Sequence, residues 1–205
     1  TATGPIKDIH FWGSLADDIL PPDGPGSLTF KVAIHADIPA TTAKPWSTPG
    51  EPLWTRTFEP GQYTVRQVHE GPEGWYDPAT KLYLPNNHKM AYQYNLCIDV
   101  EPFVQQEGKI YWLVIKDIAP ANAGYTFGWK TTTRRLRWND DAVYLDSAGL
   151  GWLPMTYPGG HAYKGETLDL AFVITGRKEV KPQHELGDAP DSTNTWGIAM
   201  TAYPK

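Results

Sequence analysis

The 205-residue sequence contains one cysteine, Cys97, so no internal disulfide can form and cysteine usage leaves the cellular compartment open. It also lacks a basic run: 18 Lys and Arg residues stand against 23 Asp and Glu residues, and the formal net charge is −5. Because nucleic acids are bound through clustered Lys and Arg, we expect no nucleic-acid partner. The longest apolar runs, such as residues 110–115, are too short to span a bilayer as a helix, so we expect no transmembrane segment.

Catalytic motifs are missing as well, since the sequence has no Gly-x-Ser-x-Gly elbow and no His-Glu-x-x-His. Three carboxylates, Glu70, Glu73 and Asp77, lie near an aromatic segment, and a glycosidase would need a pair of them at a defined separation. His10 and His35 fall on early predicted strands, but a zinc site needs three or four ligands and no third is placed by the sequence. We therefore predict that the protein is not an enzyme and keep a polysaccharide hydrolase as the second alternative.

Aromatic residues and turn formers are abundant, with nine Trp, eleven Tyr, nineteen Gly and nineteen Pro. Apolar residues alternate with polar ones over residues 28–36, 92–100 and 168–174, and no window keeps a helical period. This pattern predicts an all-β protein: an antiparallel β-sandwich or jelly roll of about 8–10 strands with long aromatic-rich loops.

The same alternation predicts the core. Residues 110–115 are apolar on both faces, which is typical of a strand at the centre of a sheet. Cys97 is expected to be a buried small hydrophobic residue. The residues expected in the core are Leu28, Phe30, Val32, Ile34, Leu96, Ile98, Trp112, Val114, Leu170 and Phe172.

Three segments follow one another along the chain: a β-sandwich domain over residues 1–176, a polar linker over 177–194 and a C-terminal strand over 195–205. In the last segment one face of the predicted strand carries Trp196, Ile198, Met200 and Ala202. We hypothesise that this strand pairs with a neighbouring copy by β-augmentation and so builds a filament. The alternatives are a strand that folds back onto its own domain and the start of a following domain.

A long predicted loop over residues 71–88 holds Trp75, Tyr76 and Tyr83. Long loops in compact domains are often functional, and exposed Trp and Tyr rings stack on the apolar faces of sugars. These three residues are therefore candidates for carbohydrate binding. The alternative is that the rings fold back over the sandwich as a lid.

Oxygen-bearing side chains gather at Asn139, Asp140, Asp141 and Asp146. Calcium takes six to eight oxygen ligands, so this loop is a candidate Ca²⁺ site, although its spacing is not that of an EF-hand. The alternative is a solvated acidic turn in which Asn and Asp cap the local backbone. A weaker acidic cluster consists of Asp17, Asp18 and Asp23.

Several segments, among them GPIKDIHFWGS at 4–14, WNDDAV at 138–143 and LDLAFVIT at 168–175, resemble an uncharacterised family of bacterial secreted domains in large surface-associated proteins. The segment LGDAPDS at 186–192 resembles one that opens new domains in bacterial surface adhesins. Members of the family carry a further strand upstream, and this chain opens at Thr1 without Met, as a mature or trimmed protein does. The resemblance implies an extracellular or cell-surface location, a structural or adhesive role, and other copies or surface proteins as partners. A carbohydrate-binding module, with a polysaccharide as partner, is the alternative.

Overall fold

The computed structural model describes residues 3–120, 123–132, 142–146 and 149–176. The strands are β1 (Gly4–Pro5), β2 (Asp8–Leu15), β3 (Phe30–Ile38), β4 (Thr48–Phe58), β5 (Tyr63–Asp77), β6 (Leu82–Cys97), β7 (Val104–Gln105), β8 (Tyr111–Asp117), β9 (Phe127–Trp129), β10 (Val143–Asp146), β11 (Gly151–Pro154) and β12 (Phe172–Thr175). Two 3₁₀ turns, η1 (Ala16–Asp18) and η2 (Pro25–Ser27), are the helical elements of this part of the chain. In it, no helix is long and apolar enough to cross a membrane.

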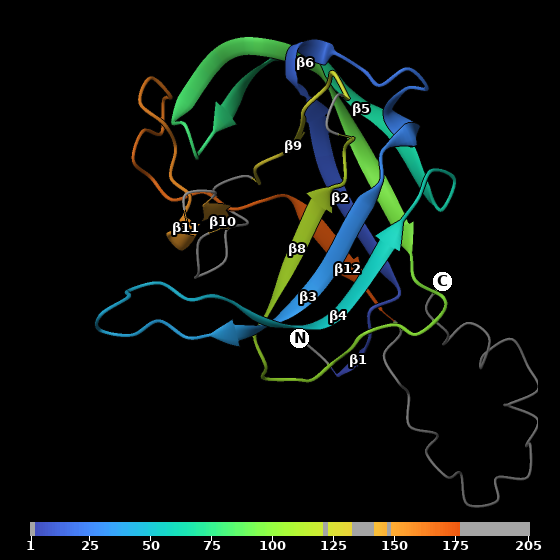
Figure 1. Ribbon diagram of the computed structural model, residues 1–205, viewed down its shortest axis with the longest axis vertical. Helices are drawn as coiled ribbons and strands as arrows, with labels where there is room; N and C mark the ends of the chain where they lie inside the picture. The colour runs from blue at the N-terminus through green and yellow to red at the C-terminus, as the bar shows by residue number, and fades with distance from the viewer. Residues whose placement is uncertain (1–2, 121–122, 133–141, 147–148, 177–205) are drawn as a thin grey trace, which may run out of the picture.

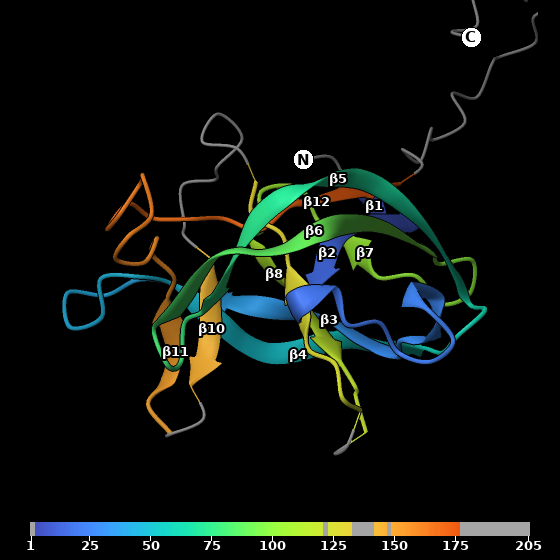
Figure 2. The ribbon, with the colours of Figure 1, turned by 90° about the horizontal axis from the view of Figure 1, so that it is seen from above.

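Two antiparallel sheets form the body of the protein (Figures 1 and 2). One has the strand order β12-β2-β6-β5, with β9 also paired to β2, and the other has the order β4-β3-β8. The pairs β1–β7 and β10–β11 are small sheets of their own. The all-β antiparallel fold predicted from the sequence is confirmed.

The core lies between the two sheets, where the alternating apolar residues of β2, β3 and β6 meet. Phe30 is fully buried at its centre, with its ring centroid 5.1 Å from that of Phe11, 5.0 Å from that of Tyr94 and 5.2 Å from that of Phe127. Most of these rings meet edge to face, an arrangement that aromatic quadrupoles favour. One aromatic cluster therefore joins strands of both sheets.

The predicted core residues on β3 and β6 are buried, as are Leu28 and Ile98 beside them. Trp112 and Val114 are only half-buried, because β8 pairs with β3 alone and is an edge strand instead of the predicted central one. Leu170 is half-buried, and Phe172 is 42% exposed on another edge strand, β12.

Cys97 is exposed, so the prediction of a buried cysteine is wrong. The alternation itself puts Cys97 on the outer face with Gln93 and Asn95, opposite Leu96. Its thiol lies 3.3 Å from Asp99 Oδ2, and this hydrogen bond, with a smaller contribution from burial, raises the pKa of Cys97.

Residues 71–88 form the distal half of a long β5–β6 hairpin, and the prediction of an irregular loop there is wrong. The register shifts between Gln67 and His69, between Glu70 and Glu73 and between Glu73 and Trp75. Such bulges bend a hairpin and accommodate Gly and Pro, which the sequence pattern indicated as loop residues. The hairpin therefore curves beyond the sandwich toward β10 and β11 (Figure 2).

Candidate functional site

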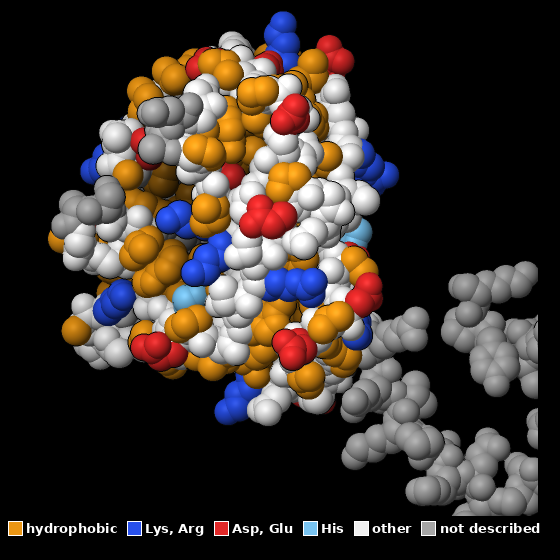
Figure 3. Space-filling view, turned by 45° about the vertical axis from the view of Figure 1, so that its right-hand side comes forward, with side chains coloured by type: hydrophobic (Ala, Val, Ile, Leu, Met, Phe, Trp, Pro, Cys, Tyr) orange, Lys and Arg blue, Asp and Glu red, His pale blue; other side chains and the backbone are white. Residues whose placement is uncertain are grey.

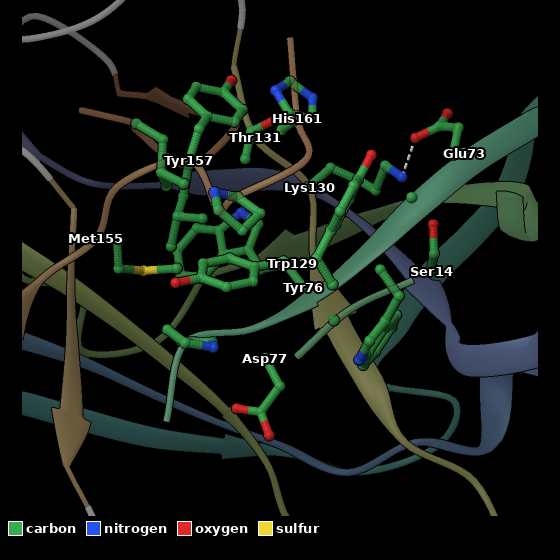
Figure 4. Close-up of a pocket in the computed structure, with 18 of the residues that line it drawn as sticks. Ser14, Glu73, Tyr76, Asp77, Trp129, Lys130, Thr131, Met155, Tyr157 and His161 are labelled. Atoms are coloured by element: carbon green, nitrogen blue, oxygen red, sulfur yellow. Dashed lines mark ion pairs between the residues drawn. The ribbon is translucent and has the colours of Figure 1, made fainter. Parts of the chain in front are cut away.

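A pocket of about 670 Å³ lies between the distal half of the β5–β6 hairpin, strand β9 and residues 155–161. A hollow bordered by hydrophobic side chains is visible at the left of Figure 3. The aromatic and sulfur-containing side chains that line the pocket are Trp75, Tyr76, Tyr83, Phe127, Trp129, Met155 and Tyr157, together with the imidazole of His161 (Figure 4). The three aromatic residues chosen from the sequence therefore share one pocket.

Two glycines let the aromatic rings of the hairpin lie directly against backbone. A Cβ atom at Gly128 would stand 2.7 Å from the Trp75 ring, and one at Gly74 would stand 2.7 Å from the Tyr83 ring. Both distances are far below van der Waals contact, so any side chain at either position would displace the ring. Trp75 thus packs on β9, which holds the distal half of the hairpin against another strand of the same five-stranded sheet.

A second group of rings forms the wall on the side of residues 155–161. The imidazole of His161 stacks on Tyr157, with centroids 4.5 Å apart and planes 17° apart, and meets Tyr83 edge-on at 5.8 Å. The hairpin ring of Tyr83 therefore stands at a steep angle to His161, and these two rings do not form a flat surface.

The polar side of the pocket centres on Lys130, which forms an ion pair with Glu73 (Figure 4). Lys130 Nζ also lies 2.9 Å from His88 Nε2, and His69 Nε2 lies 3.5 Å from Glu73 Oε1. Burial, and then the Lys130 ammonium, lowers the pKa of His88 below its ordinary 6.5. The His88 ring is therefore neutral at pH 7.

The acidic pair Asp17 and Asp18 holds the hairpin in place. The Asp18 carboxylate accepts hydrogen bonds from the backbone N–H groups of Lys89 at 2.8 Å and Met90 at 2.9 Å, and Asn87 Nδ2 donates to Asp17 Oδ1. Asp23 is exposed. Asp18 thus fixes the backbone that follows His88, and Asp17 holds the side chain of the preceding Asn87, which is a structural role for the weaker acidic cluster.

Replacing Asp18 by Asn should lower the free energy of unfolding by about 1 kcal/mol, because one of the two charge-assisted hydrogen bonds to the hairpin is lost. Asn suits this position, since Asp18 has φ of 54° and Asn tolerates that conformation. Urea unfolding followed by tryptophan fluorescence measures the change, with D23N as the matched surface control. Equal midpoints for D18N and D23N would show that the Asp18 carboxylate does not hold the hairpin.

The three carboxylates considered for catalysis have different surroundings in the structure. Asp77 accepts hydrogen bonds from the backbone N–H of Ala79 at 3.0 Å and from Thr80 Oγ1 at 2.7 Å, so it caps the hairpin turn. Glu73 is engaged by Lys130 and His69, and Glu70 is exposed on β5. In Figure 4 the Asp77 carboxylate lies well apart from the Lys130–Glu73 pair.

The remaining predicted sites have different outcomes. Asp146 accepts a hydrogen bond from the Leu150 backbone N–H at 3.3 Å in the β10–β11 turn. Two sets of predicted residues lie outside the described part of the chain. They are the proposed calcium ligands Asn139, Asp140 and Asp141, and the strand residues Trp196, Ile198, Met200 and Ala202. Among the residues that are described, no group of three or more His, Cys, Asp or Glu could hold a metal ion. His10 and His35 belong to different sheets.

Sequence reasoning missed most of this pocket. His88, Lys130, Met155, Tyr157 and His161 lie in separate parts of the chain, and no spacing or motif links them. Trp129 has two positions in the fold, since it pairs with Gly13 in the five-stranded sheet and also lines the pocket wall. The one available signal was the unusual density of aromatic residues at 75–83 and 152–163.

Comparison with known protein families matches residues 1–175 to a domain of unknown function, DUF7901. Neither the curated proteins nor the solved structures give a match. The chemistry of the pocket is therefore the main guide to what this domain does.

Proposed function

The chain belongs to the DUF7901 family, and we propose that this domain is a non-enzymatic carbohydrate-binding module that serves adhesion outside the cell. The observation that carries the proposal is the convergence of Trp75, Tyr76 and Tyr83 with Trp129 and Tyr157 on one pocket. Its volume of about 670 Å³ falls within the range of small-ligand sites, roughly 300–1,000 Å³. Aromatic walls with a few polar groups suit a sugar, whose ring has apolar C–H faces and a rim of hydroxyl groups.

Two features favour binding over catalysis. Glu73 and Asp77, the acidic residues that line the pocket, are held by contacts within the protein, one in an ion pair and one in a turn. A glycosidase needs one carboxyl group free to donate a proton and a second placed across the scissile bond. The engaged carboxylates therefore support a binding role, with hydrolase activity as the less favoured candidate.

The location and partners of the domain belong to the same proposal. An extracellular or cell-surface site, and attachment to other copies or surface proteins, agree with an adhesive role in which the saccharide is the docking partner. Calcium binding at Asn139, Asp140, Asp141 and Asp146 stays a prediction. So does filament assembly through the strand at 195–205.

Trp75→Ala should weaken saccharide binding about thirtyfold, because truncating a central interface tryptophan commonly costs about 2 kcal/mol. A glycan array of bacterial, plant and animal saccharides first identifies the ligand, and titration calorimetry then measures the affinity. Trp112→Ala is the matched control, since Trp112 is half-buried in the opposite sheet and should change the affinity less than about twofold. The proposal fails if the wild-type protein binds no saccharide, or if the two variants bind equally well.

A further inference from the structure

We infer that Ser14 and His88 form a hydroxyl-recognition site at the floor of the pocket and determine which sugar it accepts. Both side chains line the pocket, and they are 1% and 2% exposed. Ser14 Oγ and His88 Nδ1 have no hydrogen-bond partner within the described part of the chain. The inference rests on the proposed function, because it assigns the chemistry by which the same pocket selects its ligand.

Unpartnered polar atoms at such depth need a physical reason. Burying a donor or acceptor without a hydrogen bond is costly, and nearly all buried polar groups in folded proteins are paired. Here both atoms belong to side chains that border one pocket, where a ligand group can pair with them. Ser47 offers a contrast, because its hydroxyl is also buried and unpartnered but does not border the pocket.

Lys130 fixes which His88 nitrogen carries the proton. An ammonium group can only donate, so His88 Nε2, 2.9 Å from Lys130 Nζ, must be the accepting nitrogen. In the neutral imidazole the proton then resides on Nδ1, which becomes a donor. Lys130 is itself held by Glu73, so this ion pair positions the histidine and need not touch the ligand.

Trp75 connects the two floor residues. Its ring stands edge-on to His88, with centroids 6.0 Å apart, and lies over Gly128, the residue of β9 that pairs with Ser14 in β2. A sugar that packs against this aromatic wall brings its hydroxyl rim toward the floor. A hydroxyl group accepts a hydrogen bond from Nδ1–H and donates its own proton to Ser14 Oγ, so a sugar hydroxyl supplies both the acceptor and the donor that these two atoms need.

The test uses the saccharide that binds best on the glycan array, with Ser14→Ala as the first variant. S14A should bind this saccharide about tenfold more weakly, while its melting temperature without ligand stays equal or rises, because a buried unpartnered hydroxyl is removed. Ser47→Ala removes a hydroxyl of the same kind away from the pocket and should leave the affinity unchanged.

Variants of His88 distinguish the roles of its two ring nitrogens. His88→Gln keeps an acceptor near Nε2 for Lys130 and loses the Nδ1 donor, so it should also lose about tenfold in affinity. His88→Asn keeps a donor near the Nδ1 position and should bind more tightly than H88Q. Mono-deoxy analogues, each lacking one hydroxyl group of the saccharide, allow a double-mutant cycle between protein and ligand. Wild type should bind one of these analogues about tenfold more weakly than the parent saccharide, and S14A should bind the two equally well.

The outcomes distinguish this inference from the proposed function. If W75A loses binding while S14A and H88Q bind as wild type does, the pocket binds saccharide but the floor holds only a structural water, and the inference is overturned. If wild type binds no saccharide, the proposed function and the inference fall together. If S14A, H88Q and the deoxy analogue lose affinity as stated, the floor is the selective part of the site.

Discussion

Phe30→Ala should lower the free energy of unfolding by about 3–5 kcal/mol, the range found when a fully buried phenylalanine is truncated. Phe30 is 0% exposed, and its ring packs against Phe11, Tyr63, Tyr94 and Phe127. Because all four aromatic partners belong to the five-stranded sheet that faces β3, they cannot collapse into the space left by the ring without moving the two sheets toward each other. The cavity therefore stays largely open and its cost is added to the lost burial.

Urea unfolding of wild type and F30A, followed by tryptophan fluorescence, measures this loss. Phe172→Ala is the matched control, since Phe172 is 42% exposed on edge strand β12 and its truncation should cost less than about 1 kcal/mol. Comparable losses in the two variants would contradict the placement of the core around Phe30. Folded domains typically have an unfolding free energy of roughly 5–15 kcal/mol, so enough F30A should stay folded at low temperature for its unfolding to be measured.

Alternation of apolar residues was enough to predict the all-β class and the central strands β3 and β6. Their inner faces, with Phe30, Val32 and Leu96 among them, are buried as expected. The period of two dictates which face of a strand is buried, but it says nothing about which strand lies beside which. The apolar run at 110–115 shows the limit: β8 is apolar on both faces, yet it lies at an edge, and Trp112 gains partial cover and a hydrogen bond of 2.7 Å to Asp37 there.

The candidate site was only partly predictable for a different reason. Gly71, Pro72 and Gly74 indicated a loop, whereas the strands of the hairpin continue through them with bulges. This is tolerable because, among the described residues, no third strand pairs with the distal half of the hairpin, so a proline there removes no backbone donor that a further strand would need. The aromatic residues were therefore identified, but the opposite wall and the polar floor depend on tertiary contacts such as that of Lys130 with His88.

Asp117→Asn should stabilise the protein at neutral pH, because burial raises the pKa of the Asp117 carboxyl from its ordinary 3.8 to about 6. Asp117 lies at the end of β8 with its Oδ1 buried and without a hydrogen-bond partner among the described residues. Between these two pKa values the folded protein keeps a proton that the unfolded chain has released. The stability contributed by this residue is therefore fully present below about pH 4 and is lost as the pH rises toward 6.

A shift of this size corresponds to about 3 kcal/mol if none of it is screened, and partial exposure reduces it to about 1–2 kcal/mol. Asn cannot ionise, so D117N should match wild type near pH 4 and exceed its unfolding free energy by that amount above pH 6. Urea unfolding of both proteins at intervals from pH 4 to pH 7.5 measures the difference, and taking the difference cancels the other titrating groups. The D23N variant, altered at an exposed carboxylate, should show the same pH dependence of the unfolding free energy as wild type. If D117N also runs parallel to wild type, the Asp117 carboxylate is ionised in the folded protein at no cost, and its environment is more polar than its burial indicates.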